Sequence, residues 1–177
     1  MEDNYDISGL KKKKRKNSRA KGSTFERDIA KKLNEKFETT EFSRSPGSGA
    51  FATTHSLPDY LKIYGDLITP QNFKFCIECK KGYNSVNQYS FFDYSSELWG
   101  FIEQCKRDAD KSGKAGMLLF KQDRRPILAI IPSNIIIPNK YRHITIHKKK
   151  DSYNIYYFEE LLETLELSFW FDSEESQ

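Results

Sequence analysis

The sequence predicts an α/β domain built from a central β-sheet flanked by helices. Segments with apolar residues every three or four positions, as in amphipathic helices, alternate with short apolar runs of strand length. Two of those runs, 114–121 and 125–131, are joined by a tight turn and predict neighbouring buried strands. With 177 residues and 37% hydrophobic content, the chain is large enough to bury one core.

Composition limits where such a protein works. No apolar run approaches about 18 residues, the length that a membrane-spanning helix needs. The lysine-rich start lacks the apolar segment and cleavage site of a secretory signal. Three cysteines, an odd number, argue against a disulfide framework and fit a reducing compartment. We therefore expect a cytoplasmic protein that has no membrane partner.

Charge is distributed unevenly along the chain. Residues 1–21 carry eight Lys or Arg against three acids, whereas residues 159–177 carry seven acids and no Lys or Arg. Because a dense basic block repels itself, residues 1–20 are expected to be a disordered tail ahead of a single domain, 21–177. We interpret the tail as a phosphate-binding segment; a solvated arm or a nuclear address signal is the alternative. The block consists of Lys11, Lys12, Lys13, Lys14, Arg15 and Lys16.

The domain opens with a predicted helix that has a core-facing stripe. Its apolar residues recur at every fourth position over about four turns: Phe25, Ile29, Leu33 and Phe37. Ser23-Thr-Phe-Glu26 has the S-x-x-E form of a capping box. These residues alone favour Glu26 as the cap of its own helix over Glu26 as an outer ligand of a metal or water.

A predicted short strand, 41–45, leads into thirteen residues of turn chemistry, 46–58. Gly47 and Gly49 allow the backbone to approach a phosphate closely, and Arg44 stands at the entrance. We interpret the segment as a mobile functional loop; a disordered insertion is the alternative. It is not a Walker-type P-loop, because no Gly-Lys-Ser/Thr sequence closes it.

The stretch 65–80 holds the main candidates for chemistry. If 73–80 is a strand, its alternation places Glu78 and Lys80 side by side on one face. A hairpin after Asp66 would bring that residue beside them. Two carboxylates and an amine suit a hard divalent cation with an ammonium that orients or deprotonates a water. A Glu-x-Lys triplet is nevertheless common, and an ion pair on a solvated strand is the simpler explanation of the triplet alone.

The rest of the chain continues the α/β pattern. A helix over 92–111 is predicted to stop at Ser112-Gly113. A strand pair over 141–146 and 153–158 and a last helix over 158–167 follow.

Cys76-Ile-Glu-Cys79 has the spacing of a zinc or redox site. Positions three apart on a strand face opposite ways, however, and no second Cys or His pair supports such a site. We therefore do not interpret the pair as a metal or redox centre.

Five pieces of the chain, in this order, resemble the PD-(D/E)XK nuclease superfamily, and more narrowly its archaeal and phage Holliday junction resolvases. They are Lys21-Gly-Ser-x-x-Glu26-Arg27, Arg44-Ser-Pro-Gly-Ser48-Gly49, Gly65-Asp66-Leu-Ile, Glu78-Cys-Lys80, and Gln104-Cys-Lys-Arg-Asp-Ala-Asp-Lys-Ser-Gly ahead of Met117. The resemblance implies a restriction-endonuclease-like core, in which helices flank a central mixed β-sheet. One departure is Gly65, where the family often has Pro.

The resemblance also implies roles for individual residues. Asp66 and Glu78 would hold Mg²⁺, for which Mn²⁺ can substitute, with the Cys79 carbonyl as a further ligand. Lys80 would position or activate the attacking water, and Glu26 would act near the metal, which reverses the preference for a cap. Ser48 would lie in a loop that closes on the scissile strand, and Gln104 would support the site. Besides the tail, the expected DNA contacts are Lys21, Arg27, Arg44, Lys81 and Arg107.

The implied activity is paired symmetric nicking of four-way DNA junctions by a homodimer, in DNA recombination and repair, inside the host cytoplasm if a phage encodes the protein. Candidates for the dimer interface, or alternatively for the core, are Phe91, Phe92, Tyr94 and Trp99. A duplex or single-strand nuclease of the same superfamily is an alternative, because substrate choice lies in loops and dimer geometry. A non-catalytic nucleic-acid-binding module is a further alternative, against which the joint presence of Asp66, Glu78 and Lys80 argues.

Overall fold

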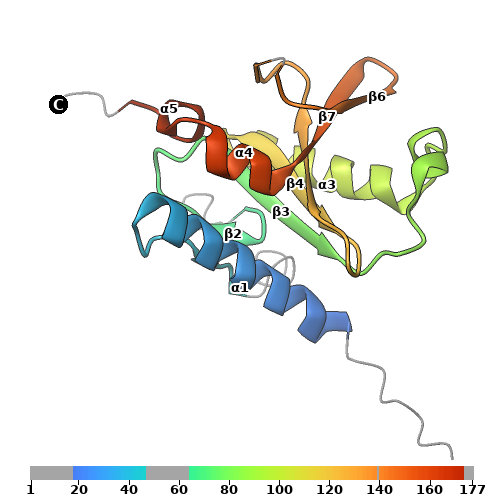
Figure 1. The fold of residues 1–177 in the computed structure, drawn as a ribbon. Helices are drawn as coiled ribbons and strands as arrows, with labels where there is room; N and C mark the ends of the chain where they lie inside the picture. Colours follow the sequence, from blue (N-terminus) through green and yellow to red (C-terminus); the bar gives the residue numbers. More distant parts are fainter. Residues whose placement is uncertain (1–17, 47–63, 139, 174–177) are drawn as a thin grey trace, which may run out of the picture.

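The computed structural model describes residues 18–46, 64–138 and 140–173 (Figure 1). Its centre is a five-stranded sheet of order β3-β4-β5-β7-β6. The β3–β4 pair is parallel and the other neighbours are antiparallel, so the predicted α/β class with a central mixed sheet is confirmed. The strands are β3 (Phe75–Lys81), β4 (Ala115–Lys121), β5 (Ile127–Pro132), β6 (Ile144–Lys148) and β7 (Asp151–Tyr157).

Helices cover both faces of this sheet (Figure 1). On one face, α1 (Ser18–Phe37), α4 (Phe158–Thr164) and α5 (Leu167–Trp170) pack against the side chains of Ile77 and Leu119. On the other face, α3 (Glu97–Ser112) packs against Leu118 and Phe120. Alternate residues of β4 therefore belong to two different cores, as the period of two along a strand requires.

The predicted stripe on the first helix lies in the core, where Phe25, Ile29 and Leu33 are buried and Phe37 is partly buried. The predicted start of that helix is wrong. α1 begins at Ser18, five residues before Ser23, and the Ser23 hydroxyl donates to the carbonyl of Ala20 at 3.3 Å. Because Ser23 lies inside the helix, Ser23 and Glu26 cannot form a capping box.

Two other helix boundaries differ from the prediction. The segment ahead of α3 forms a short 3₁₀ helix, η3 (Gln88–Phe91), and α3 begins five residues later than position 92. Asp93 explains the delay, because its carboxylate accepts from the Ser95 amide and hydroxyl and stabilises a turn in place of a helix. The last helix is divided into α4 and α5, because Leu165 adopts an extended conformation.

A second, two-stranded ladder pairs β1 (Ser43–Arg44) with β2 (Leu67–Ile68). The predicted tail up to residue 17, most of the loop 46–58, Ser48 and Lys11–Lys16 lie outside the described residues. Within the part that the structure describes, no helix is long and apolar enough to cross a membrane.

Candidate active site

Asp66 is held against the edge of β3 by its main chain and its side chain. Its amide donates to the carbonyl of Ile77 at 2.8 Å, and its Oδ2 accepts the amide of Cys79 at 2.8 Å. Gly65 allows this close approach: its φ is +77°, and a Cβ there would lie 2.6 Å from the Ile77 carbonyl oxygen. Proline, with φ near about −65°, cannot adopt this turn. The departure from the family's usual Pro is therefore a requirement of the local backbone.

Glu78 and Lys80 project from the face of β3 that α3 covers. The Lys80 Nζ lies 2.5 Å from the Glu78 Oε1, and Gln104 of α3 donates its Nε2 to the same oxygen at 2.8 Å. Glu78 is only 1% exposed. The Lys80 ammonium also lies 5.4 Å from the ring centroid of Phe101. The strand and the helix together hold this carboxylate in a single position, with a cation beside it.

Burial makes the ionised form of the Glu78 carboxylate unfavourable, and the negative charge of Asp66 adds to this effect. Burial first, and then the charge of Asp66, raises the pKa of Glu78 from 4.5 to about 8, although Lys80 opposes the shift. Burial alone would lower the pKa of Lys80, but the Glu78 carboxylate raises it above its usual value. A neighbouring cation would therefore stabilise the ionised carboxylates.

Glu26 enters the same region from α1. It is buried, and burial together with the charge of Asp66 raises its pKa. Its Oε2 accepts from the Nε of Arg44 on β1, which opposes that shift. Arg44, expected to contact DNA, thus pairs with Glu26 in this structure; a phosphate contact by Arg44 remains a prediction.

The sequence interpretation missed Asp108. It lies on α3 one turn after Gln104 and is half-buried, and burial raises its pKa. Its charge contributes to the raised pKa of Glu78. The four-residue spacing from Gln104, which places both side chains on one helix face, is the signal that could have found it.

The donor set fits Mg²⁺ through two carboxylates. Among residues 18–46, 64–138 and 140–173, no three His, Cys, Asp or Glu side chains form a group that could hold a metal ion by themselves. Mg²⁺ is commonly held by one or two carboxylates, with waters and substrate phosphate completing its shell. Asp66 and Glu78 would supply two hard oxygen ligands; each of them, like Glu26, has one carboxylate oxygen bonded within the protein and a second oxygen that bonds none of the described residues.

Basic residues lie around this cluster. The Lys81 Nζ is 5.8 Å from the ring centroid of Phe25, the residue that precedes Glu26 in α1. Lys21 and Lys81 both act on Asp123, whose pKa is lowered by a hydrogen bond from Asn84 and by these charges. Arg27 and Arg107 lie on the surfaces of α1 and α3 and are exposed.

The aromatic candidates separate into two groups. Trp99 is 1% exposed and belongs to the core under α3, and Phe91 packs against that core. Phe92 and Tyr94 are 83% and 51% exposed. The core interpretation therefore holds for Trp99 and Phe91, and a dimer interface at Phe92 and Tyr94 stays a prediction.

Comparison with known proteins identifies a matching family model, a relative and a solved structure. Residues 17–172 match the model of a phage PDDEXK endonuclease family. Protein D14 of Escherichia phage T5 is 31% identical over 142 residues, covering 75% of this chain and 83% of its own length. The structure of Hjc, a Holliday junction resolvase of Archaeoglobus fulgidus, aligns with 16% identity and a TM-score of 0.39, covering 76% of this chain and 88% of Hjc.

Proposed function

The chain belongs to the phage PDDEXK endonuclease family, and we propose that it is a Mg²⁺-dependent DNA endonuclease that cuts four-way junctions by paired symmetric nicks as a homodimer. The observation that carries the proposal is the arrangement along β3: Asp66 accepts the Cys79 amide, Lys80 pairs with Glu78, and Gln104 fixes Glu78 from the facing helix. The charge of Asp66 acts on Glu78 and raises its pKa. Mn²⁺ is expected to replace Mg²⁺, since both ions take carboxylate oxygens.

The residues of the chain divide the work of phosphodiester hydrolysis. Mg²⁺ held by Asp66 and Glu78 would supply a Lewis acid for the phosphate and a bound water of lowered pKa. The Lys80 ammonium, which pairs with Glu78, would orient the attacking water and offset charge on the phosphate. The Cys79 amide keeps Asp66 in place, and Gln104 does the same for Glu78. Positioning of this kind is a large part of such catalysis.

Junction selectivity rests on the resemblance of the five sequence pieces, 21–131, to resolvases. A two-fold dimer suits this activity, because two symmetric nicks require two sites. The basic tail, Lys11–Lys16, would add contacts to phosphates that carry no sequence information.

The test compares a four-way junction with a linear duplex of the same sequence, incubated with the protein and Mg²⁺. The proposal predicts paired nicks at symmetric positions in the junction and much slower cutting of the duplex. Equal cutting of both would identify a duplex nuclease of the same superfamily. Absence of cutting with either Mg²⁺ or Mn²⁺ would leave a DNA-binding module.

A further inference from the structure

Residues 82–96, which connect β3 to α3, present three aromatic side chains to solvent, of which Tyr94 is the least exposed at 51%. We name this segment the aromatic loop. Tyr89 and Phe92 are 73% and 83% exposed. Val86 and Phe91 of the same loop point inward and pack against the core under α3. The loop thus has an apolar inner side that fixes it and an aromatic outer side whose exposure costs free energy in water.

The β4–β5 turn binds the start of the aromatic loop. Gln122 donates its Nε2 to the carbonyls of Tyr83 and Val86 at 3.0 and 2.5 Å. Asn84 donates its Nδ2 to the Asp123 Oδ2 at 3.1 Å, and the Asp123 amide donates to the Asn84 Oδ1 at 3.0 Å. These four bonds join the β4–β5 turn, 122–126, to the aromatic loop, 82–96. We call the two segments together the ridge.

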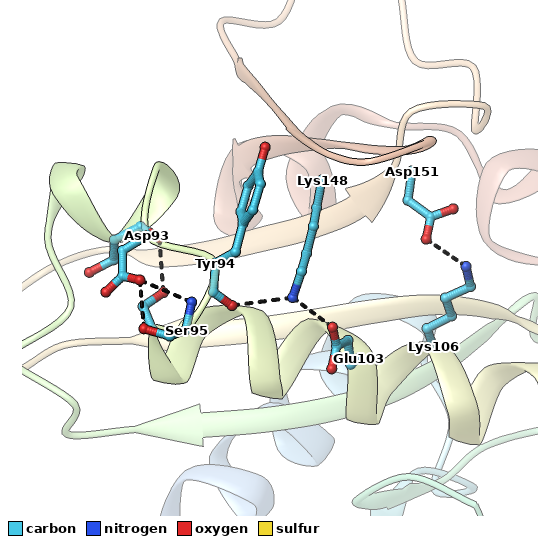
Figure 2. A network of polar contacts seen from close by, with 9 residues as sticks. Asp93, Tyr94, Ser95, Glu103, Lys106, Lys148 and Asp151 are labelled. Carbon is cyan, nitrogen blue, oxygen red and sulfur yellow. Dashed lines mark hydrogen bonds and ion pairs between the residues drawn. The ribbon is translucent and has the colours of Figure 1, made fainter.

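The end of the aromatic loop is held by the β6–β7 hairpin, as Figure 2 shows. Lys148 donates its Nζ to the carbonyl of Tyr94 at 3.3 Å and to Glu103 of α3 at 2.7 Å. Asp93 accepts from the amide and hydroxyl of Ser95 at 3.0 and 2.7 Å. Because both ends are bonded, the exposed aromatic side chains are carried on a backbone that is already ordered. Little entropy would be lost when a ligand contacts them.

The ridge is basic where it meets the candidate active site. Lys81 and Lys121 are partners in the parallel β3–β4 register, and Arg124 follows Asp123 in the β4–β5 turn. The charges of Lys21, Lys81 and Arg124 all contribute to the lowered pKa of Asp123. Lys81 directly follows Lys80 of the site. Positive charge therefore adjoins the region where the scissile phosphate is expected, and the same ridge carries the exposed aromatic rings. This is the combination by which proteins hold single-stranded nucleic acid, with cations on phosphates and aromatic rings on bases.

A nucleic acid fits this ridge better than a second copy of the chain. The exposed rings are flanked by polar residues such as Ser90 and Asp93, and each aromatic side chain buries only about 150–250 Å². A stable dimer interface buries about 800 Å² on each partner. A two-fold interface at the ridge would also bring two copies of Lys81 and Arg124 together, and like charges oppose that contact.

We propose that the ridge binds unpaired nucleotides of branched DNA next to the cleavage site, with Tyr89 and Phe92 stacked on bases and Arg124 on a backbone phosphate. This inference rests on the proposed function for the identity of the substrate as DNA. Selectivity for branched DNA would then come partly from bases that a perfect duplex keeps stacked inside its helix.

The test measures binding by fluorescence anisotropy in EDTA, so that no DNA is cut. The two probes are a linear duplex and the same duplex ending in an unpaired fork. The double substitution Tyr89→Ala and Phe92→Ala is expected to weaken fork binding about ten- to a hundredfold and duplex binding less than about twofold. Ile136→Ala is the matched control, because Ile136 is exposed (89%) but lies outside the ridge. It should change neither affinity.

Arg124→Ala should weaken binding of both probes and reduce the slope of log affinity against log salt by about one unit. The inference is overturned if wild-type protein shows no preference for the fork, or if the double substitution weakens both probes equally. It is also overturned if that substitution changes the sedimentation coefficient, which would make the ridge a contact between copies. A fork preference in a protein that cuts no DNA would uphold the ridge and remove the proposed function instead.

Discussion

The two sides of α3 carry charged groups of opposite character. On the side that faces β3, Glu78 is buried, and its burial together with the charges of Asp66 and Asp108 raises its pKa to about 8. On the side that faces the β6–β7 hairpin, Glu103 and Asp151 are each matched by a lysine near the surface, and the pKa values of both are lowered (Figure 2).

The two sides of α3 thus differ in whether each carboxylate has its own cationic partner near the surface or is buried with other carboxylates. Partly or fully exposed ion pairs such as Lys148–Glu103 and Lys106–Asp151 attach a hairpin to a helix and cost little to form. A buried group of carboxylates with an incomplete complement of cations opposes folding. Such a group is typical of a site that binds a cation in its working state. Matched substitutions on the two sides of α3 therefore have different expected effects.

The largest expected difference is in cleavage rate. Asp66→Asn removes one carboxylate of the site and should slow single-turnover cleavage about a thousandfold or more, since the charge stabilisation of a metal site is worth several kcal/mol. Asp151→Asn makes the same chemical change on the hairpin side and should leave the rate within about twofold. Equal rates for the two variants would contradict the assignment of Asp66 to the site.

The second difference concerns stability and its pH dependence. The pKa of Glu78 is raised from 4.5 in the unfolded chain to about 8 in the folded one, so the folded state binds this proton more tightly. The stability that this proton contributes is therefore fully present below about pH 4.5 and is lost as the pH rises towards 8. In EDTA at pH 8, Glu78→Gln should raise the free energy of unfolding by about 1–3 kcal/mol.

The matched substitution is Glu103→Gln, whose carboxylate has a lowered pKa and a lysine partner. It should leave stability unchanged or slightly reduced at pH 8. Urea unfolding of both variants and the wild type at pH 5 and pH 8 measures the effect. An increase at pH 5 as large as at pH 8 would show that ionisation of Glu78 is not the cause.

A smaller effect is expected from the residue that positions Glu78. Gln104→Ala removes the hydrogen bond to the Glu78 Oε1 and should lower the cleavage rate about tenfold, or about 1.4 kcal/mol, with little change in melting temperature. Lys106→Ala, two residues along the same helix, faces the hairpin and serves as the control. A rate loss with both variants would indicate a general disturbance of α3.

The smallest expected effect belongs to the hairpin contacts themselves. Lys106→Ala breaks the ion pair with Asp151, in which both side chains are about 40% exposed. Because exposed pairs contribute little, the melting temperature should fall by no more than about 2–3 °C, and the difference should shrink in high salt. A larger fall would show that the hairpin is a cooperative part of the core.

Alternation along a strand made the centre of the site predictable. The period of two along 73–80 placed Glu78 and Lys80 on one face and Ile77 on the other, and the structure confirms both faces. The stripe on the first helix was predictable for the same reason, because each pattern depends only on near neighbours along the chain.

Contacts between distant segments were not predictable from such patterns. The pairing of Glu26 with Arg44 joins residues 18 positions apart, and from the sequence Glu26 looked like a helix cap. The polar residues ahead of α1 gave no sign that the helix begins at Ser18. Nor does periodicity reveal that Gly65 must approach the Ile77 carbonyl, because that requirement comes from the turn that brings Asp66 to β3.

The central claim is that the carboxylates beside β3 bind a divalent cation and hydrolyse DNA with it. The most direct measurement is single-turnover cleavage of a labelled four-way junction at increasing Mg²⁺, by wild-type protein and by Glu78→Gln, with junction binding measured in parallel. We predict Mg²⁺-dependent cleavage by the wild type, and binding without cleavage by the variant. Cleavage by Glu78→Gln at the wild-type rate, with the same Mg²⁺ dependence, would contradict the claim.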